Sequence, residues 1–323
     1  MSDQEFELLK ISDIKEPKGP QWLVTDLWAV NAVGIIAGEP KSYKTWLGLD
    51  LALSVASGTP CLDKFEVPER GPVLIYLAED TLWSLKQRLT SISQHRGLSL
   101  EDLPLYTLTA PRLQLASPGR YRQQEQNDQD RLRAKIQKLK PKLVLLDPLV
   151  RISQADENNA NEMSELLGYV RGLQREFNTC VALTHHMRKP RSDSGRQGGN
   201  DLRGSSNLYS WGDSLIFVNK CGEKRITVKV EHRDNQAPDN FGLVITEPEE
   251  GMRLKLVEAP SVRKLKTPLR DRILEYLGSH KEPLNVHDLR ERIGVSNDSL
   301  RAALKKMLEE NLVRKEGAGY LLV

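Results

Sequence analysis

A short turn between an apolar run and a helical run constrains this chain most. Residues 33–37 are apolar and end at a glycine, as in a buried strand, and residues 46–55 carry apolar side chains at helical spacing. Between them, residues 38–45 fit the pattern Gly-x-x-x-x-Gly-Lys-Ser/Thr at every fixed position except the second glycine, where Tyr43 stands. In such a turn the backbone N–H groups and the helix N-terminus surround a polyphosphate. The turn predicts a nucleotide phosphate site, and the alternative is an ordinary polar connection between strand and helix.

We call residues 38–45 the phosphate loop; its members are Gly38, Glu39, Pro40, Lys41, Ser42, Tyr43, Lys44 and Thr45. Lys44 is expected to neutralise the β- and γ-phosphates, and the Thr45 hydroxyl to ligate Mg²⁺. Lys41 adds a second positive charge. A non-glycine residue in a left-handed conformation costs about 1–2 kcal/mol. Because Tyr43 replaces a glycine, we expect a loop that is either strained or differently shaped.

An aspartate, Asp147, directly follows the apolar run at residues 143–146. A phosphate-loop enzyme needs such a carboxylate to hold magnesium through Thr45 and water. An apolar strand that ends in aspartate is common by itself, but after a phosphate loop it predicts a metal site. ATP and Mg²⁺ are therefore the expected cofactors.

A second carboxylate, Glu79, follows the apolar run at residues 73–77, and Asp80 is next to it. Glu79 is predicted to act as the base for an attacking water, with Asp80 as the second candidate. The alternative is that either residue caps the helix expected at residues 81–89.

Two histidines, His185 and His186, follow the expected strand at residues 181–184. They are predicted to lie at the same edge of the sheet and to contact the γ-phosphate. The alternative is a pair of ordinary surface residues.

Apolar runs that alternate with helical segments indicate the fold class. The expected strands are residues 33–37, 73–77, 143–146, 181–184, 215–218 and 226–230. Helices are expected between them, including residues 130–140 and 163–177. This order predicts an α/β fold with a mainly parallel sheet covered on both faces. Two polar stretches, residues 117–130 and 187–200, are expected to be loops.

Composition narrows the class of protein. The chain has 323 residues, 39% of them apolar, and a formal net charge of +3. Its apolar runs are far shorter than the ~18 residues of a membrane span, and no apolar export segment stands at the N-terminus. Three cysteines without Cys-x-x-Cys spacing offer neither a disulfide framework nor a zinc ribbon. We expect a cytoplasmic protein of about two domains.

The order of these parts resembles the RecA-like fold, and in particular the hexameric replicative helicases of the DnaB and plasmid RepA type. The resemblance covers residues 30–245. Besides the phosphate loop, the segments that carry it are residues 76–80, 146–150 with 156–159, 185–189, 201–206 with 213–217, and 231–235. The sequence departs from the family at Tyr43, and a counterpart of the N-terminal collar domain of DnaB is not expected in these residues.

This resemblance implies roles for individual residues. It makes Glu79 the catalytic carboxylate, Asp147 the magnesium-binding acid and His185 the sensor. It makes Arg233, with Arg203 as the second candidate, an arginine finger that acts on the neighbouring subunit, and so implies a homo-oligomeric ring or filament. Such a finger is worth about 10³–10⁵ in rate. The alternative for Arg233 is a strand-end residue in a surface ion pair.

The polar stretch at residues 187–200 occupies the position of the channel-facing loop of RecA-like motors. It is rich in glycine and contains Arg188, Lys189, Arg191 and Arg196. Cations on such a loop can track the backbone of single-stranded DNA without reading bases. The alternative is a disordered surface loop.

The C-terminal part differs in composition. After a basic linker at residues 259–268, residues 261–323 contain 13 basic and 9 acidic residues. Helices at 270–278, 286–293 and 298–310, followed by strand-like pieces at 312–315 and 320–323, resemble a winged helix. Its third helix would present Asn297, Ser299, Arg301 and Lys305 to duplex DNA, and Lys315 would contact phosphate. The alternative is a protein-docking module.

The expected organisation is an approach segment (1–30), a RecA-like ATPase domain (31–258), a linker (259–268) and a winged helix (269–323). The predicted function is that of an ATP-dependent, DNA-associated motor, as in a replicative helicase of a plasmid, phage or mobile element. The alternatives are an ATP-gated DNA-binding regulator or filament former that unwinds nothing, and a scaffold ATPase whose tail recruits a partner.

Overall fold

The computed structural model describes most of the chain, in ranges separated by short gaps. These ranges are residues 8–15, 21–110, 112–116, 122–153, 159–187, 202, 207–246, 251–257, 269–280, 282–293, 297–317 and 319–323. Within them, no helix is long and apolar enough to span a bilayer.

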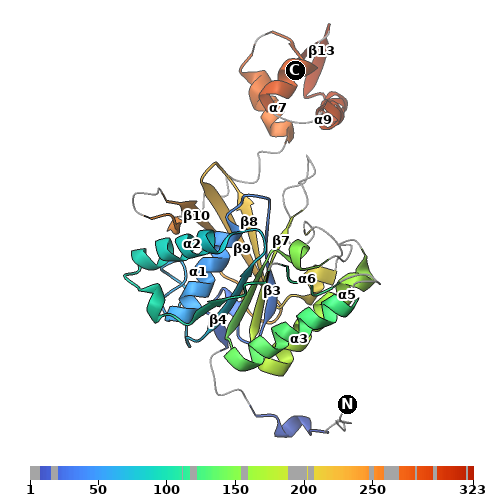
Figure 1. Cartoon of the computed structure of the whole chain (residues 1–323). Helices are drawn as coiled ribbons and strands as arrows, with labels where there is room; N and C mark the ends of the chain where they lie inside the picture. Colours follow the sequence, from blue (N-terminus) through green and yellow to red (C-terminus); the bar gives the residue numbers. More distant parts are fainter. Residues whose placement is uncertain are drawn as a thin grey trace.

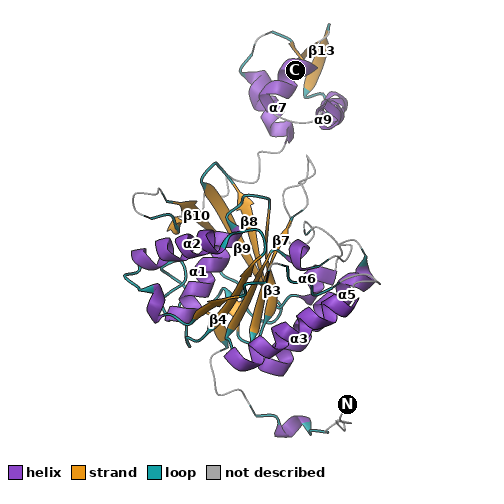
Figure 2. Ribbon diagram, in the orientation of Figure 1, coloured by secondary structure: helices purple, strands orange, loops and turns teal. Residues whose placement is uncertain are grey.

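A nine-stranded sheet forms the centre of the described N-terminal part, in the order β11-β10-β9-β8-β3-β7-β6-β4-β5 (Figures 1 and 2). Its strands are β3 (Val33–Gly38), β4 (Val73–Leu77), β5 (Leu105–Thr107), β6 (Leu143–Asp147), β7 (Cys180–His186), β8 (Ser214–Lys220), β9 (Arg225–His232), β10 (Phe241–Ile245) and β11 (Leu254–Val257). Strands β8, β3, β7, β6, β4 and β5 run parallel, and β9, β10 and β11 add antiparallel pairs. The α/β fold with a mainly parallel sheet is therefore confirmed.

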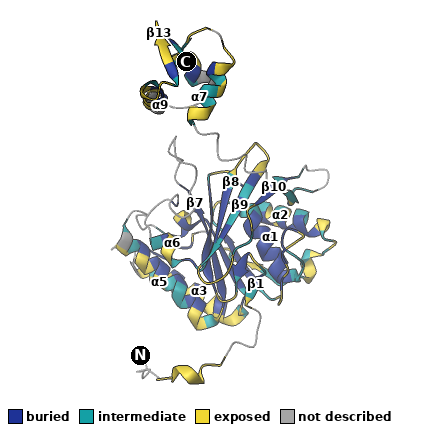
Figure 3. Ribbon diagram, turned by 180° about the vertical axis from the view of Figure 1, so that it is seen from behind, coloured by how far each residue is buried: buried dark blue, intermediate teal, exposed yellow. Residues whose placement is uncertain are grey.

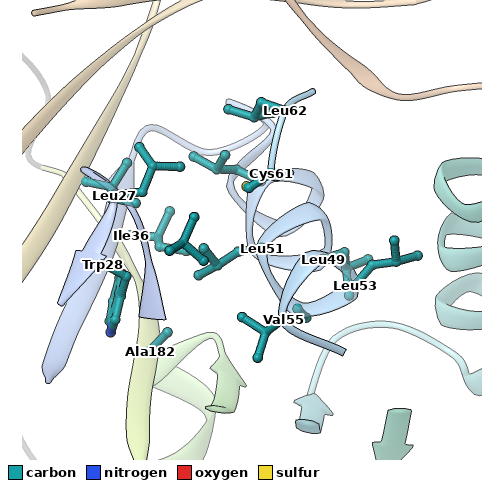
Figure 4. Close-up of a cluster of buried hydrophobic side chains, with 14 of the residues drawn as sticks. Leu27, Trp28, Ile36, Leu49, Leu51, Leu53, Val55, Cys61, Leu62 and Ala182 are labelled. Atoms are coloured by element: carbon teal, nitrogen blue, oxygen red, sulfur yellow. The ribbon is translucent and has the colours of Figure 1, made fainter. Parts of the chain in front are cut away.

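Helices cover both faces of this sheet (Figure 1). One face packs against α1 (Lys44–Ser57) and α2 (Leu82–His95), which we call the first layer. The other face packs against the second layer, which consists of α3 (Arg122–Leu139), α4 (Leu149–Ile152), α5 (Ala160–Phe177) and α6 (Asn207–Trp211). Strand β3 is buried along its whole length because Ile36 faces the first layer and Ile35 the second. Figure 4 shows the apolar contacts between α1 and the sheet, and Figure 3 shows how burial concentrates in the sheet.

A small hairpin closes one end of the first layer. Strands β1 (Trp22–Val24) and β2 (Trp28–Ala29) pair with each other, and Trp28 is fully buried. The Ala29 backbone N–H donates to Ser214 Oγ (3.0 Å). The end of the expected approach segment therefore packs into the core.

Most expected strands and helices are present, but one polar stretch is not a loop. Residues 117–130 were expected to lack regular structure, and α3 already begins at Arg122. Gln, Glu, Arg and Lys favour helix, yet the buried apolar side chains among the described residues of α3 are only Leu132 and Ile136. The first turns of α3 therefore lack the apolar periodicity that would reveal a helix.

The C-terminal part has a core of its own. It contains α7 (Leu269–Gly278), β12 (Leu284–Asn285), α8 (Val286–Ile293), α9 (Asn297–Glu309), β13 (Val313–Glu316) and β14 (Gly319–Leu322). The strands form an antiparallel sheet in the order β12-β14-β13. Its buried cluster includes Ile273, Leu289, Leu304 and Val313. The expected helices and hairpin are all present, and β12 is an addition.

A buried ion pair joins α1 to the end of α2. Arg96 Nη2 lies 2.7 Å from Asp50 Oδ1, and the two side chains are only 5% and 4% exposed. Arg96 Nη1 also donates to the hydroxyls of Ser54 (2.7 Å) and Thr59 (3.0 Å), and the Leu62 N–H donates to Asp50 (2.8 Å).

Replacing Arg96 with alanine is expected to lower the free energy of unfolding by about 3–5 kcal/mol, because Asp50 would remain buried and uncompensated. The matched control is Arg133→Ala, which breaks the exposed pair with Glu176 and should cost about 0–1 kcal/mol. Urea denaturation measures both. Equal losses in the two variants would show that the buried pair has no special role.

Candidate functional site

The parallel strands bring the predicted residues to one edge of the sheet. We call the edge where β3, β4, β6 and β7 end the phosphate edge, and the opposite one the far edge. Gly38 lies beside His186, and Leu77 lies beside Asp147. The phosphate loop, Asp147, Glu79 and the two histidines therefore meet at the phosphate edge, as their positions after strands predict.

The phosphate loop connects β3 directly to α1. A Cβ on Gly38 would lie 2.5 Å from Ser42 Oγ and 2.7 Å from the Val218 carbonyl oxygen, so this position requires glycine. Lys41 and Tyr43 have φ angles of 59° and 63°, in the left-handed region. The loop is thus strained at Tyr43, the first of the two expected shapes.

Contacts of the Tyr43 side chain offset this strain. Its ring packs against the core of the first layer, and its hydroxyl donates to the Glu223 carbonyl oxygen in the turn between β8 and β9 (3.2 Å).

Two substitutions of Tyr43 separate backbone strain from side-chain packing. Both Tyr43→Ala and Tyr43→Gly remove the ring, but only glycine adopts φ near 63° without strain. We expect Tyr43→Gly to be about 1–2 kcal/mol more stable than Tyr43→Ala. Urea unfolding of the pair tests this; an alanine variant as stable as the glycine variant would mean that Tyr43 carries no backbone strain.

The Lys44 side chain bends back and binds the backbone of its own loop. Its Nζ donates to the carbonyl oxygens of Gly38 (3.0 Å) and Glu39 (2.7 Å), and the residue is 7% exposed. Burial lowers its pKa to about 8, and the charges of Asp147, Glu79 and Glu39 oppose the shift. Lys44 is therefore mostly protonated at pH 7. An anionic phosphate bound in the loop would compete with the two carbonyl oxygens for its ammonium group.

Asp147 presents one fixed and one open carboxylate oxygen. Thr184 Oγ1 donates to Oδ1 (2.6 Å), whereas Oδ2 is buried and lacks a hydrogen-bond partner among the described residues. Burial raises the pKa of Asp147, and the hydrogen bond from Thr184, the nearby Thr45 hydroxyl and the charge of Lys44 oppose the rise. Two hard oxygen donors, the Thr45 hydroxyl and the Asp147 carboxylate, fit a magnesium ion.

The two carboxylates after β4 have different partners. Glu79 Oε1 accepts from Arg151 Nε (2.7 Å), whereas both Asp80 oxygens bind Arg88 (2.9 Å each). Neither caps α2, because the N-cap is Thr81, which accepts from the Ser84 N–H. The capping alternative is therefore wrong. The Ala78 N–H donates to the Asp147 carbonyl oxygen (2.7 Å), so Glu79 directly follows a residue held at the phosphate edge, and its charge raises the pKa of Lys44.

Arg151 and Arg88 were not identified from the sequence. Arg151 belongs to the short helix α4 after Asp147, and Arg88 lies over the Trp46 ring, 5.8 Å from its centroid. The sequence around an arginine in a helix does not indicate which carboxylate it binds. Arg151 is 72 residues from Glu79 along the chain, and Arg88 is 8 residues from Asp80.

The histidines end β7 beside the phosphate loop. His185 is fully buried and lies opposite Ala37 of β3, so it is not a surface residue. His186 lies opposite Gly38, and the Met187 N–H donates to the Gly38 carbonyl oxygen (3.1 Å).

Arg233 lies at the far edge. It directly follows β9, whose His232 is beside Ser214 at the start of β8. Ser214 lies beside Gly34 and Val218 beside Gly38, so at ~3.3 Å per residue Arg233 is about 16 Å from the phosphate edge along the sheet. Arg233 Nη1 lies 3.5 Å from Asp213 Oδ1, so the surface ion pair of the alternative exists within this chain. Arg203, Arg188, Lys189, Arg191 and Arg196 lie outside the described residues.

The predicted DNA-contacting cations of the C-terminal part are exposed. Arg301 and Lys305 lie one turn apart on α9, and the buried Leu300 and Leu304 occupy its other face. Lys315 is exposed on β13.

A family model described as an AAA domain (AAA_25) matches residues 3–192, more than half of the chain. The chain belongs to this AAA family. The matched segment of the AAA domain contains the phosphate loop, Glu79, Asp147 and His185, and it ends before Arg233. A RecA-like P-loop ATPase core, the broader prediction from the sequence, agrees with this membership.

Many solved structures are similar to this chain. The crystal structure of the RadB recombinase is similar, with 18% identical residues and a TM-score of 0.49 over 70% of this chain and 91% of that one. No curated protein matches the chain.

Proposed function

We propose that the chain hydrolyses ATP at the phosphate edge and uses the reaction to act on DNA, as a replicative helicase of the RepA/DnaB type. The observation that carries the proposal is the set of groups around Lys44. A buried ammonium, an open oxygen of Asp147 and the hydroxyl of Thr45 converge beside a loop of backbone N–H groups. This is the donor set that a magnesium–triphosphate complex needs.

Each residue at the phosphate edge has a distinct role in hydrolysis. Lys44 leaves the Gly38 and Glu39 carbonyls and neutralises the β- and γ-phosphates. Glu79, held by Arg151, orients the attacking water and accepts its proton. Asp147 and Thr45 would hold magnesium, which would polarise the phosphate oxygens when bound. His185 contacts the γ-phosphate as a sensor.

We further propose that Arg233 completes the site of a neighbouring copy. Because Arg233 is about 16 Å from its own phosphate edge, it cannot reach its own nucleotide. A guanidinium at the far edge, 45% exposed, suits contact with the phosphate edge of the next copy in a ring or filament.

The C-terminal part is proposed to be a winged helix that binds duplex DNA. The exposed cations Arg301 and Lys305 on α9 support this role, with Lys315 on the hairpin as a phosphate contact. Single-stranded DNA is proposed to bind the basic segment at residues 187–200.

Single-stranded DNA is expected to stimulate ATP hydrolysis, because binding of the phosphate backbone favours the assembled, active form. The test is a DNA titration at low salt, where the electrostatic contribution is largest. A rate that stays constant across the titration would contradict the motor.

A second candidate is an ATP-gated regulator that hydrolyses slowly, and the strained backbone at Tyr43 favours it. A strand-displacement assay on a forked duplex separates the two, because only a motor releases the strand.

A further inference from the structure

A separate charge network lies at the far edge, where α5 and α6 meet the start of β8. Its centre is Asp213, directly before β8. Arg171 of α5 binds both carboxylate oxygens, at 2.5 and 3.0 Å, and the Val33 N–H donates to Oδ2 (3.1 Å). Both side chains of the Arg171–Asp213 pair are less than one-fifth exposed.

The same pair fixes the end of α6. Arg171 Nη2 donates to the Trp211 carbonyl oxygen (2.6 Å), and the guanidinium lies 5.7 Å from the centroid of the Trp211 ring. Trp211 Nε1 in turn donates to the Leu167 carbonyl oxygen of α5 (3.0 Å). The last residue of α6 is therefore held by α5 through both its carbonyl oxygen and its side chain.

Arg233 has the last two carbonyl oxygens of α6, rather than the carboxylate, as its main partners. Its Nη2 donates to the oxygens of Ser210 (2.5 Å) and Trp211 (3.1 Å), while its contact with Asp213 is longer, at 3.5 Å. Two guanidinium groups share one carboxylate, so the cluster keeps one positive charge. The nearby Glu231 already binds Lys229 (2.7 Å) and Tyr209 (2.8 Å).

We propose that Arg171 is a positioning residue for Arg233, an inference that rests on the proposed role of Arg233 in a neighbouring copy. By occupying Asp213, Arg171 prevents that carboxylate from binding Arg233 in a bidentate pair. Arg233 is then oriented by neutral carbonyls, keeps its charge, and remains partly exposed for a phosphate of the nucleotide bound to the next copy.

A second substitution at Asp213 is expected to restore the activity that a substitution of Arg171 removes. In Arg171→Gln, Asp213 is free to capture Arg233, so the kcat for ATP hydrolysis should fall about 10²-fold while KM stays constant, because misplacing a catalytic group costs about that much. In Arg171→Gln/Asp213→Asn the capturing charge is gone, and kcat should return to within about tenfold of the wild type. Arg171→Lys, which keeps the charge, should retain most activity.

Matched controls distinguish positioning from folding. Arg175→Gln replaces an exposed arginine one turn further along α5 and should leave kcat unchanged. Urea unfolding of each variant verifies that the fold persists, and Arg233→Ala provides the reference for a lost finger.

The outcomes separate this inference from the proposed function. If Arg233→Ala lowers kcat but Arg171→Gln does not, or if the double variant is as inactive as the single one while folded, Arg171 does not position Arg233 and only the inference fails. If Arg233→Ala itself leaves kcat unchanged, the role of Arg233 fails and the inference fails with it.

Discussion

Replacing Arg233 with alanine is expected to lower the kcat for DNA-stimulated ATP hydrolysis by about 10³–10⁵-fold, the range of an arginine finger. The physical reason is that negative charge spreads over the γ-phosphoryl oxygens during transfer, and a desolvated guanidinium stabilises it. ATP binding should change little, because Arg233 is at the far edge and does not touch the phosphate loop of its own chain. The measurement is steady-state hydrolysis with saturating single-stranded DNA.

A mixing experiment tests whether Arg233 acts between copies. Arg233→Ala subunits retain an intact phosphate loop, and Lys44→Ala subunits retain an intact finger. Oligomers assembled from both should recover activity that neither variant has alone. If the mixture is as inactive as its components, or if the active protein is a monomer, Arg233 does not act in trans.

Replacing Lys44 with alanine is expected to abolish turnover, with a loss of at least about 10²–10³-fold from the missing cation at the phosphates. Lys44 is buried and mostly protonated at pH 7, since its pKa is lowered only to about 8. Its charge therefore acts in a poorly solvated site, where it is worth more than an exposed one. Steady-state ATP hydrolysis of the purified variant measures the effect.

Lys41→Ala is the matched control within the same loop. Lys41 is exposed, so its charge is screened by water and its loss should cost less than about tenfold. Hydrolysis at the wild-type rate in Lys44→Ala would show that the phosphate loop takes no part in hydrolysis.

The sequence predicts the central sheet well because buried parallel strands are continuous apolar runs. Strands β3, β4, β6 and β7 lie where those runs are, and their C-terminal ends form the phosphate edge. The helix α3 was predicted too short because its first turns are polar. The edge strand β5 was missed because it has three residues and is half exposed.

Functional residues could be predicted from the sequence only where they directly follow an expected strand or belong to the phosphate loop. Lys44, Asp147 and Glu79 are such residues. The partners Arg151 and Arg171 come from helices and contact residues far away along the chain, so no local pattern reveals them. The position of Arg233 relative to Lys44 also depends on the antiparallel direction of β9, which an apolar run does not specify.

Whether the groups around Lys44 bind a nucleotide can be measured by calorimetric titration with a non-hydrolysable ATP analogue. With magnesium present, we expect one analogue bound per chain, and a large loss of affinity in Lys44→Ala. If the folded wild-type protein takes up neither adenine nor guanine nucleotide under these conditions, the groups around Lys44 are not a nucleotide site and the proposed ATP hydrolysis is wrong.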